Sequence, residues 1–245
     1  MNNMNCLNIW QDRSSFLGAF PATSWHSHGS PVLLLGVSGR FELEFRDGKK
    51  VVTSSAIVDA GISHKVEPCN ELMALFYLNT KSLDAHRMRI HYLAGSEYAI
   101  DVACTSLGER RFLNLVHDFE FNELLRDSLP SIYSAVDERI QKSLRCFYQD
   151  KNQQSMKELA EKVGMSSSRY SHLFTESMGV SYRKYRQWSK LSCFYQQYAK
   201  TGNLTDAALL SGYSDSSHFS NSFKNIFGVA PSQILNKHID LNIYF

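Results

Sequence analysis

The chain has 245 residues, of which 43% are apolar and 20% charged, and its formal net charge is +2. This composition is typical of a soluble globular protein with one large domain or two modest ones. No apolar run approaches the roughly 18 residues that a membrane span needs, which argues against a membrane protein.

The N-terminus, MNNMNCLNIW, lacks a basic patch followed by an apolar core, so no secretory signal is expected. The five cysteines are scattered, without a C-x-x-C pair, which argues against a disulfide framework and a zinc ribbon. We therefore expect a cytoplasmic protein with free thiols. The cysteines are Cys6, Cys69, Cys104, Cys146 and Cys193.

Charge divides the chain unevenly. Residues 1–130 carry 12 Lys and Arg against 15 Asp and Glu, net −3, whereas residues 131–245 carry 14 against 9, net +5. An acidic half joined to a basic half indicates two different tasks. The basic half is a candidate for binding a polyanion, and a merely solvated basic surface is the alternative.

Short strands are expected from about Trp25 to Leu78. The run VLLLGV is apolar throughout, and FELEF alternates apolar with acidic residues before a turn at Asp47-Gly48. Asp-Gly between alternating segments is a strong hairpin signal. Two further segments, AIVDAG and LMALFYL, complete the set, which predicts a small β-sandwich or barrel.

Helical spacing replaces this alternation after Lys81, and helices with short loops are expected from Pro130 to the C-terminus. One amphipathic helix is predicted before that proline, and its apolar stripe either packs on the β domain or joins two copies of the chain. The stripe consists of Phe112, Leu115, Val116 and Phe119.

The helical half contains a repeat: SMKELAEKVGMSSSRYSHLFTESMGVSY, from Ser155, matches NLTDAALLSGYSDSSHFSNSFKNIFGVAP, from Asn203. Each copy opens with a capping box, carries an alanine four residues before a glycine, and continues after a polar turn with an apolar stripe. This is a helix-turn-helix plan, whose second helix lies in the major groove of DNA. The matching positions are Ser155 with Glu158 and Asn203 with Asp206, Ala160 with Gly164 and Ala208 with Gly212, and Tyr170, Phe174 and Met178 with Phe219, Phe223 and Phe227.

The polar front of each second helix is the predicted DNA-reading surface. Short hydroxyls let a helix approach base edges, Asn pairs bidentately with adenine, and Lys contacts phosphate. One copy alone could be a solvated helix face, but two copies in register favour DNA binding. The predicted DNA-binding residues are Ser168, Arg169, Ser171 and His172 in the first copy and Ser216, Ser217, His218, Asn221 and Lys224 in the second.

The stretch SGYSDSSHFSNSFKNIFGVAPSQI resembles the signature of AraC/XylS-type transcription regulators, and the resemblance covers about residues 135–236. It implies two helix-turn-helix units, joined by a long helix at about Tyr182–Lys200, that read successive major-groove segments. The sequence departs from the family pattern at Lys190, usually arginine, at Phe194, usually small, and at Ile234-Leu235, usually Tyr-Arg.

The N-terminal half resembles the family's cupin-like sensor domain at WHSHGSPVLLLGVSGRFEL and DAGISHKVEP. The resemblance implies that three histidines converge, and imidazole suits zinc, iron and nickel. The carboxylate usual in cupin enzymes is missing, because Val32 and Leu33 stand in its place. We therefore expect no metal and no cofactor, but a small organic effector instead. The predicted ligand-binding residues are Trp25, His26, His28, His64 and Tyr77.

Together these observations predict an α+β protein of two domains. We expect a cupin-like β-barrel or sandwich sensor at residues 1–95, a helical linker or dimerisation segment at 96–130, and an all-α DNA-binding domain with two helix-turn-helix units at 131–245. The expected function is a sequence-specific transcription regulator without enzymatic activity. Expected partners are double-stranded DNA, a small organic effector, a second copy of the chain and, if it is an activator, RNA polymerase.

Two alternatives stay open from the sequence. The first is a cupin-type metal oxygenase with an appended helical domain, which a stoichiometric metal would favour. The second is an architectural DNA-binding protein without an effector, in which the β domain only dimerises.

Overall fold

The computed structural model describes residues 5–10, 13–80, 82–102, 137–149, 154–178, 180–235 and 239–243. The chain forms two compact units. The β unit comprises Met1–Ile132 and Ser220–Phe245, and the helical unit comprises Tyr133–Phe219. The predicted helix around Phe112, Leu115, Val116 and Phe119 lies outside the described residues.

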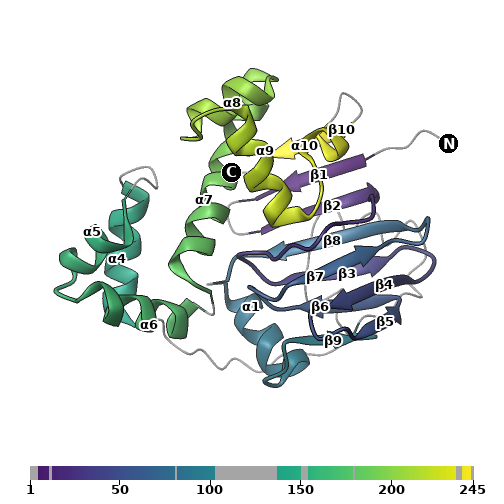
Figure 1. Ribbon diagram of the computed structural model, residues 1–245, viewed down its shortest axis with the longest axis horizontal. Helices are drawn as coiled ribbons and strands as arrows, with labels where there is room; N and C mark the ends of the chain where they lie inside the picture. Colours follow the sequence, from purple (N-terminus) through teal and green to yellow (C-terminus); the bar gives the residue numbers. More distant parts are fainter. Residues whose placement is uncertain are drawn as a thin grey trace. The chain divides into compact units, whose positions relative to one another are not determined.

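Two sheets make up the described strands of the β unit (Figure 1). The larger sheet has the strand order β10-β1-β2-β8-β3-β6-β9, and the smaller has the order β5-β4-β7. Neighbouring strands pair antiparallel, except that β10 runs parallel to β1. The strands are β1 (Asn5–Ile9), β2 (Arg13–Ala19), β3 (Val32–Gly36), β4 (Phe41–Phe45), β5 (Lys50–Thr53), β6 (Ser55–Val58), β7 (His64–Glu67), β8 (Leu72–Leu78), β9 (Tyr98–Ile100) and β10 (Ile239–Ile243).

The predicted hairpin forms as β4 and β5. Alternation in β4 buries its three apolar residues and leaves its two glutamates half-buried. At the turn, Asp47 Oδ1 accepts the N–H of Lys49 at 2.9 Å, and Gly48 has a φ of +85°, which glycine adopts without a steric penalty. The expected strands in VLLLGV, AIVDAG and LMALFYL are also confirmed, as β3, β6 and β8.

Sequence patterns did not indicate β1, β2, β9 or β10, and the expectation of helix up to the C-terminus is wrong at β10. Polar residues interrupt the apolar pattern of β1 and β2. Their side chains can nevertheless be buried, because they form hydrogen bonds with one another. Asn8 Nδ2 donates to Ser15 Oγ at 3.2 Å, and Asn242 Nδ2 of β10 donates to Asn8 Oδ1 at 3.1 Å. These paired amides join three strands.

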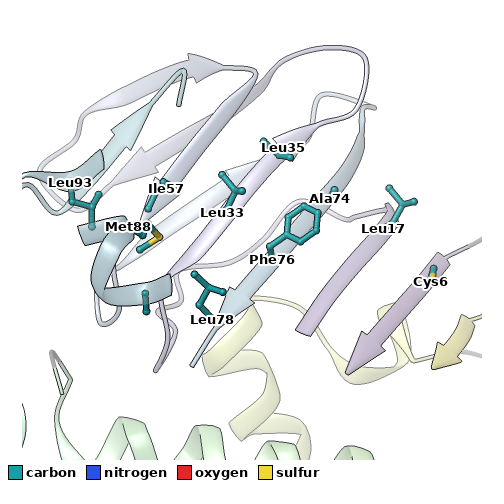
Figure 2. Packing of buried hydrophobic residues seen from close by; sticks show 11 residues of the cluster. Cys6, Leu17, Leu33, Leu35, Ile57, Ala74, Phe76, Leu78, Met88 and Leu93 are labelled. Atoms are coloured by element: carbon teal, nitrogen blue, oxygen red, sulfur yellow. The ribbon is translucent and has the colours of Figure 1, made fainter. Parts of the chain in front are cut away.

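One face of the larger sheet carries an apolar core covered by α1 (Leu83–Met88) and the π-helical turn η1 (Arg89–Leu93), as Figure 2 shows. Successive side chains of a strand point to opposite faces. Phe76 and Leu78 belong to this core, so Tyr77 between them points to the other face. The core residues are Cys6, Leu17, Leu33, Leu35, Ile57, Ala74, Phe76, Leu78, Ala85, Met88 and Leu93.

The helices follow the predicted repeat. Helices α6 and α9 are both 12 residues long, and α9 begins 49 residues after α6, whereas α8 begins 48 residues after α5. The second turn is therefore one residue longer than the first. The helices are α4 (Glu138–Gln149), α5 (Met156–Lys162), α6 (Ser167–Met178), α7 (Tyr182–Thr201), α8 (Leu204–Leu210), α9 (Ser216–Phe227) and α10 (Pro231–Ile234).

The joining helix expected at about Tyr182–Lys200 forms as helix α7. Helix α9 begins in the helical unit and ends in the β unit, whose second segment starts at Ser220. In the described part of the chain, no helix combines the length and the apolar character required to cross a membrane.

The pairing of β10 with β1 predicts the reactivity of one thiol. Burial, and then the charge of Asp240, raise the pKa of Cys6. Removing residues 236–245 should uncover Cys6 and lower its pKa, so that it reacts faster with iodoacetamide. Mass spectrometry of peptides measures the rate, with the exposed Cys69 as internal control. An unchanged rate at Cys6 would contradict the role of β10.

Candidate DNA-binding helices and histidine cluster

The first helix-turn-helix unit forms as the repeat predicts. The N-terminus of α5 carries the capping box: Ser155 N–H donates to Glu158 Oε2 at 2.6 Å, and Glu158 N–H donates to Ser155 Oγ at 3.3 Å. Gly164 follows α5 with a φ of +67°. The back of α6 is fully buried, and the hydroxyl of its Tyr170 lies 2.8 Å from Ser143 Oγ of α4.

The predicted reading residues of α6 lie on its outer side. Ser168, Arg169 and His172 are exposed, and Ser171 is half-buried. Ser168 and His172 stand one helical turn apart, so they share a face. The buried stripe Tyr170, Phe174 and Met178 occupies the opposite side, which leaves the polar front free to meet a ligand.

The second unit begins with a cap from the Asn203 side chain alone, instead of the reciprocal capping box that the sequence predicted there. Asn203 Oδ1 accepts the N–H groups of Thr205 and Asp206, at 2.8 and 3.2 Å, at the start of α8. Asp215 Oδ1 then accepts the N–H of His218 at 2.7 Å, which caps α9 and lowers the pKa of the Asp215 carboxyl. The His218 ring lies 3.1 Å from Ser214 Oγ, so this predicted reading residue takes part in the cap.

Two departures from the family pattern have a structural account in α7. Lys190 Nζ donates to the carbonyl of Gly212 at 2.7 Å, at the C-terminal end of α8, and lies over the ring of Tyr213. Phe194 stacks on Phe219, the first aromatic residue of α9, with ring centroids 4.1 Å apart. The larger residue at 194 thus holds the start of α9 on the joining helix.

The remaining predicted residues of α9 form its exposed front. Ser216, Ser217, Asn221 and Lys224 are all exposed. Ser217, Asn221 and Lys224 recur at spacings of four and three, so they line one face of the helix. These exposed residues are the ones that the sequence predicted to contact DNA in the second copy.

The C-terminal end of α9 is held by a segment of the β unit, residues 23–28. Both the N–H and the Oγ of Ser24 donate to the carbonyl of Gly228 at 2.8 Å, and Ser27 N–H donates to the carbonyl of Asn225 at 3.4 Å. The last carbonyls of a helix lack partners within the helix. Residues 24 and 27 supply these partners, so α9 ends on the β unit.

Gly228 sits too close to this segment for any side chain. Its φ is +73°, and a Cβ built on it would lie 2.6 Å from Thr23 Cβ and 2.7 Å from both His26 Nδ1 and Ser24 O. Phe227 packs beside it, with its ring 5.6 Å from Tyr77 and 6.0 Å from His28. Sequence reasoning missed these two contacts because it assigned Phe227 and Gly228 only to the repeat.

The same segment pairs with β7 on its other edge, which brings the histidines together. His26 and His64 exchange backbone hydrogen bonds at 3.0 and 3.2 Å. His28 lies two residues further along, hence on the same side as His26. The ring centroids are 4.4 to 5.3 Å apart, and one ring nitrogen from each histidine lies within 4.8 Å of the others.

All three imidazoles are buried, with exposed fractions of 5% for His26, 3% for His28 and 0% for His64. Burial, and then the neighbouring His64, lower the pKa of His26 to about 3. Burial also lowers the pKa of His64 to about 4. Both rings are therefore neutral near pH 7.

Backbone carbonyls fix the tautomers of two rings. His26 Nδ1 lies 2.9 Å from Ser24 O, and His64 Nδ1 lies 3.0 Å from Ile62 O. A carbonyl only accepts, so each Nδ1 carries the proton and each Nε2 has a free lone pair. His64 Nε2 is buried without a hydrogen-bond partner among the described residues, which costs about 1–3 kcal/mol.

The structure brings four of the five predicted ligand residues together. Tyr77 packs against His28 with ring centroids 5.0 Å apart, and burial raises its pKa, so it stays a phenol. Trp25 is separate: it is half-buried, and the cations of Arg46 and Lys65 lie over its ring at 4.1 and 4.6 Å.

Comparison with known proteins agrees with this geometry. The sequence profile of a helix-turn-helix domain family matches residues 159–237. The chain is also 24% identical over 225 residues to the "Probable transcriptional regulator LumQ" of Photobacterium leiognathi, which covers 86% of this chain and 91% of that relative. This is a transcription regulator with a helix-turn-helix domain, similar to those of the AraC type. The regulator binds DNA and is not an enzyme, so the oxygenase alternative is excluded.

Solved structures of ToxT from Vibrio cholerae share the regulator's fold. ToxT of strain O395 has a TM-score of 0.57 at 13% identity, covering 92% of the regulator and 97% of ToxT. ToxT bound to (E)-4-(8-methylnaphthalen-1-yl)but-3-enoic acid has a TM-score of 0.58 at 14% identity, covering 92% and 98%. Wild-type ToxT of strain SCE256 bound to an unsaturated fatty acid has a TM-score of 0.51 at 16%, covering 91% and 93%. The likeness confirms the predicted fold class, an α+β protein with an N-terminal β domain and a C-terminal helical domain.

Because Gly228 lies so close to residues 23–28, we expect alanine at this position to destabilise the fold strongly. Gly228→Ala should lower the melting temperature more than Gly164→Ala does. Both positions have positive φ, which costs alanine about 1–2 kcal/mol. Only the side chain at 228 also strikes its neighbours, because nothing lies within 4 Å of a Cβ at 164.

Amide hydrogen exchange locates the effect. The N–H groups of Ser24 and Ser27 donate to the end of α9, so they should exchange faster in Gly228→Ala and remain protected in Gly164→Ala. Equal protection of residues 23–28 in both variants would show that the contact is not specific.

Proposed function

We propose that α6 and α9 read two successive major-groove segments of one DNA site. The support is the exposed polar front of each helix, opposite an apolar back, in two copies at an offset of 49. The proposed base and phosphate contacts are those predicted from the sequence: Ser168, Arg169, Ser171, His172, Ser216, Ser217, His218, Asn221 and Lys224. Major-groove segments on one DNA face lie about 34 Å apart.

A ligand bound in the β unit is proposed to control DNA binding. The observation that supports this is the end of α9, which rests on the segment that carries His26 and His28. A ligand that changes this segment also changes how α9 is held. For control, the ligand must bind the DNA-competent and incompetent states with different affinity.

The class of ligand favoured by the sequence is a small organic molecule, placed near Tyr77 and the three histidines. Two ToxT structures were solved with organic molecules bound, one a butenoic acid derivative and one an unsaturated fatty acid. This is consistent with an organic effector for the regulator. A thermal-shift screen of metabolites tests it, and failure to find any stabilising compound would favour the effector-free alternative.

The proposed setting follows from DNA binding. The regulator acts in the cytoplasm and, if it is an activator, contacts RNA polymerase. Two copies associate through the segment 96–130, which separates the sensor at 1–95 from the DNA-binding residues at 131–245.

The reading residues have distinct expected effects. Asn221→Ala and His172→Ala should each cost about 1–3 kcal/mol at one or two base pairs of the target site. Lys224→Ala should weaken binding to all sequences alike and flatten the salt dependence, because it removes a phosphate contact. Quantitative binding to a selected duplex and to its single-base variants measures both effects.

Lys50→Ala is the matched control for Lys224→Ala, because Lys50 is exposed on β5 and paired with Glu42. It removes the same charge from a place outside both helices, so it should leave DNA affinity almost unchanged. A footprint that protects only one groove segment would contradict reading by two helices.

Association of two copies has its own test. Phe119→Glu should shift sedimentation at tens of micromolar from dimer to monomer, because it places a charge in the predicted apolar stripe. A wild-type protein that is monomeric under these conditions would remove the stripe as a dimer interface.

A further inference from the structure

The three imidazoles of the β unit have the spacing of a metal site. One nitrogen of each of His26, His28 and His64 lies within 4.8 Å of the other two. Around a tetrahedral zinc ion, with bonds of about 2.0–2.1 Å, ligand nitrogens stand about 3.4 Å apart. Closing the cluster on an ion therefore requires movements of roughly 1 Å, within the reach of small side-chain rotations.

The surroundings prepare two of these rings as ligands. His26 and His64 each donate Nδ1–H to a backbone carbonyl, at 2.9 and 3.0 Å. Metal-binding histidines almost always donate their second ring nitrogen in this way, which orients the ring and makes the free nitrogen more basic.

We propose that His26, His28 and His64 bind one divalent transition-metal ion, of the zinc, nickel or cobalt class, as a regulatory ligand. Three imidazoles suit these ions, whereas magnesium and calcium require oxygen ligands. This ligand set leaves one coordination position open in tetrahedral geometry, which water or an oxygen atom of an organic effector can take. The inference names a ligand for the proposed sensor site, and only its effect on DNA rests on the proposed function.

The sequence argued against a metal ion, because Val32 and Leu33 stand where cupin enzymes usually have a carboxylate. The structure offers another source of negative potential. The C-terminal end of a helix carries a partial negative charge. Here the end of α9 approaches the cluster, since the built Cβ of Gly228 lies 2.7 Å from His26 Nδ1. A cation on the three histidines is attracted by the α9 terminus.

The same approach couples the ion to the recognition helix. An ion held by His26 adds an electrostatic attraction between residues 23–28 and the last turn of α9. The backbone bonds from Ser24 and Ser27 to that turn should therefore open less often when the ion is bound. The ion would act on DNA binding by stabilising the contact between residues 23–28 and the last turn of α9.

The primary experiment uses untagged, full-length protein. The protein is dialysed against a chelator, then titrated with Zn²⁺ by calorimetry and with Co²⁺ by visible absorption. We expect saturation at one equivalent and the intense d–d bands of tetrahedral Co²⁺, while Mg²⁺ shows no binding. If the wild-type protein binds neither Zn²⁺ nor Co²⁺, the inference is wrong, whatever the variants do.

The variants are chosen to keep the fold. In His64→Asn and His26→Asn the amide N–H₂ replaces Nδ1–H towards the carbonyl of Ile62 or Ser24, while the Nε2 ligand is lost. Each should abolish the Co²⁺ bands with near-native circular dichroism. His91→Asn is the matched control, because His91 is exposed on η1. Loss of the bands in His91→Asn, or their survival in His64→Asn, contradicts the assigned ligands.

Two further measurements separate this inference from the proposed function. Zn²⁺ should slow hydrogen exchange of residues 23–28 in wild type but not in His64→Asn, and unchanged exchange contradicts the link to α9. It should change DNA affinity by about 5- to 150-fold, the usual range of allosteric coupling. One bound equivalent without any change in DNA affinity supports the site and contradicts metal control of DNA binding.

Discussion

The hydrogen bonds between the end of α9 and residues 24 and 27 constrain much of this structure. The final carbonyls of the helix take their donors from the backbone of the β unit, and this requires direct backbone contact. The contact is possible only because residue 228 lacks a side chain. The helix that we propose reads DNA is thereby attached, through its main chain, to the domain that carries the candidate sensor residues.

Residues 23–28 form backbone hydrogen bonds with two neighbouring elements, β7 and α9. One edge of the segment pairs with β7 through His26 and His64, and the other meets α9 through Ser24 and Ser27. A segment bonded on both edges has few conformations available, so a change at its side chains is passed on to its backbone. Buried neutral imidazoles are suited to this role, since they change interactions strongly on meeting a cation yet tolerate an apolar setting when neutral.

Local patterns predicted much of the fold and the exposed polar faces of α6 and α9. The Asp47-Gly48 turn, the box at Ser155 and the aromatic spacing of α9 each depend on neighbours in sequence, and each is confirmed. Long-range pairing was less accessible: Asn8 looks unsuited to a buried strand until Ser15 and Asn242 satisfy its amide. The contact of Gly228 with residues 23–28 joins positions about two hundred residues apart, and no periodicity reports it.

The parallel pairing of β10 with β1 affects what happens if the end of α9 detaches. Residues 228–238 alone separate the last turn of α9 from β10, which stays bonded to the larger sheet. A short tether keeps two surfaces at an effective concentration in the millimolar range. Detachment of α9 from Ser24 and Ser27 would then be a local, rapidly reversible opening, and modest changes in contact energy at the histidines would be enough to set how often it occurs.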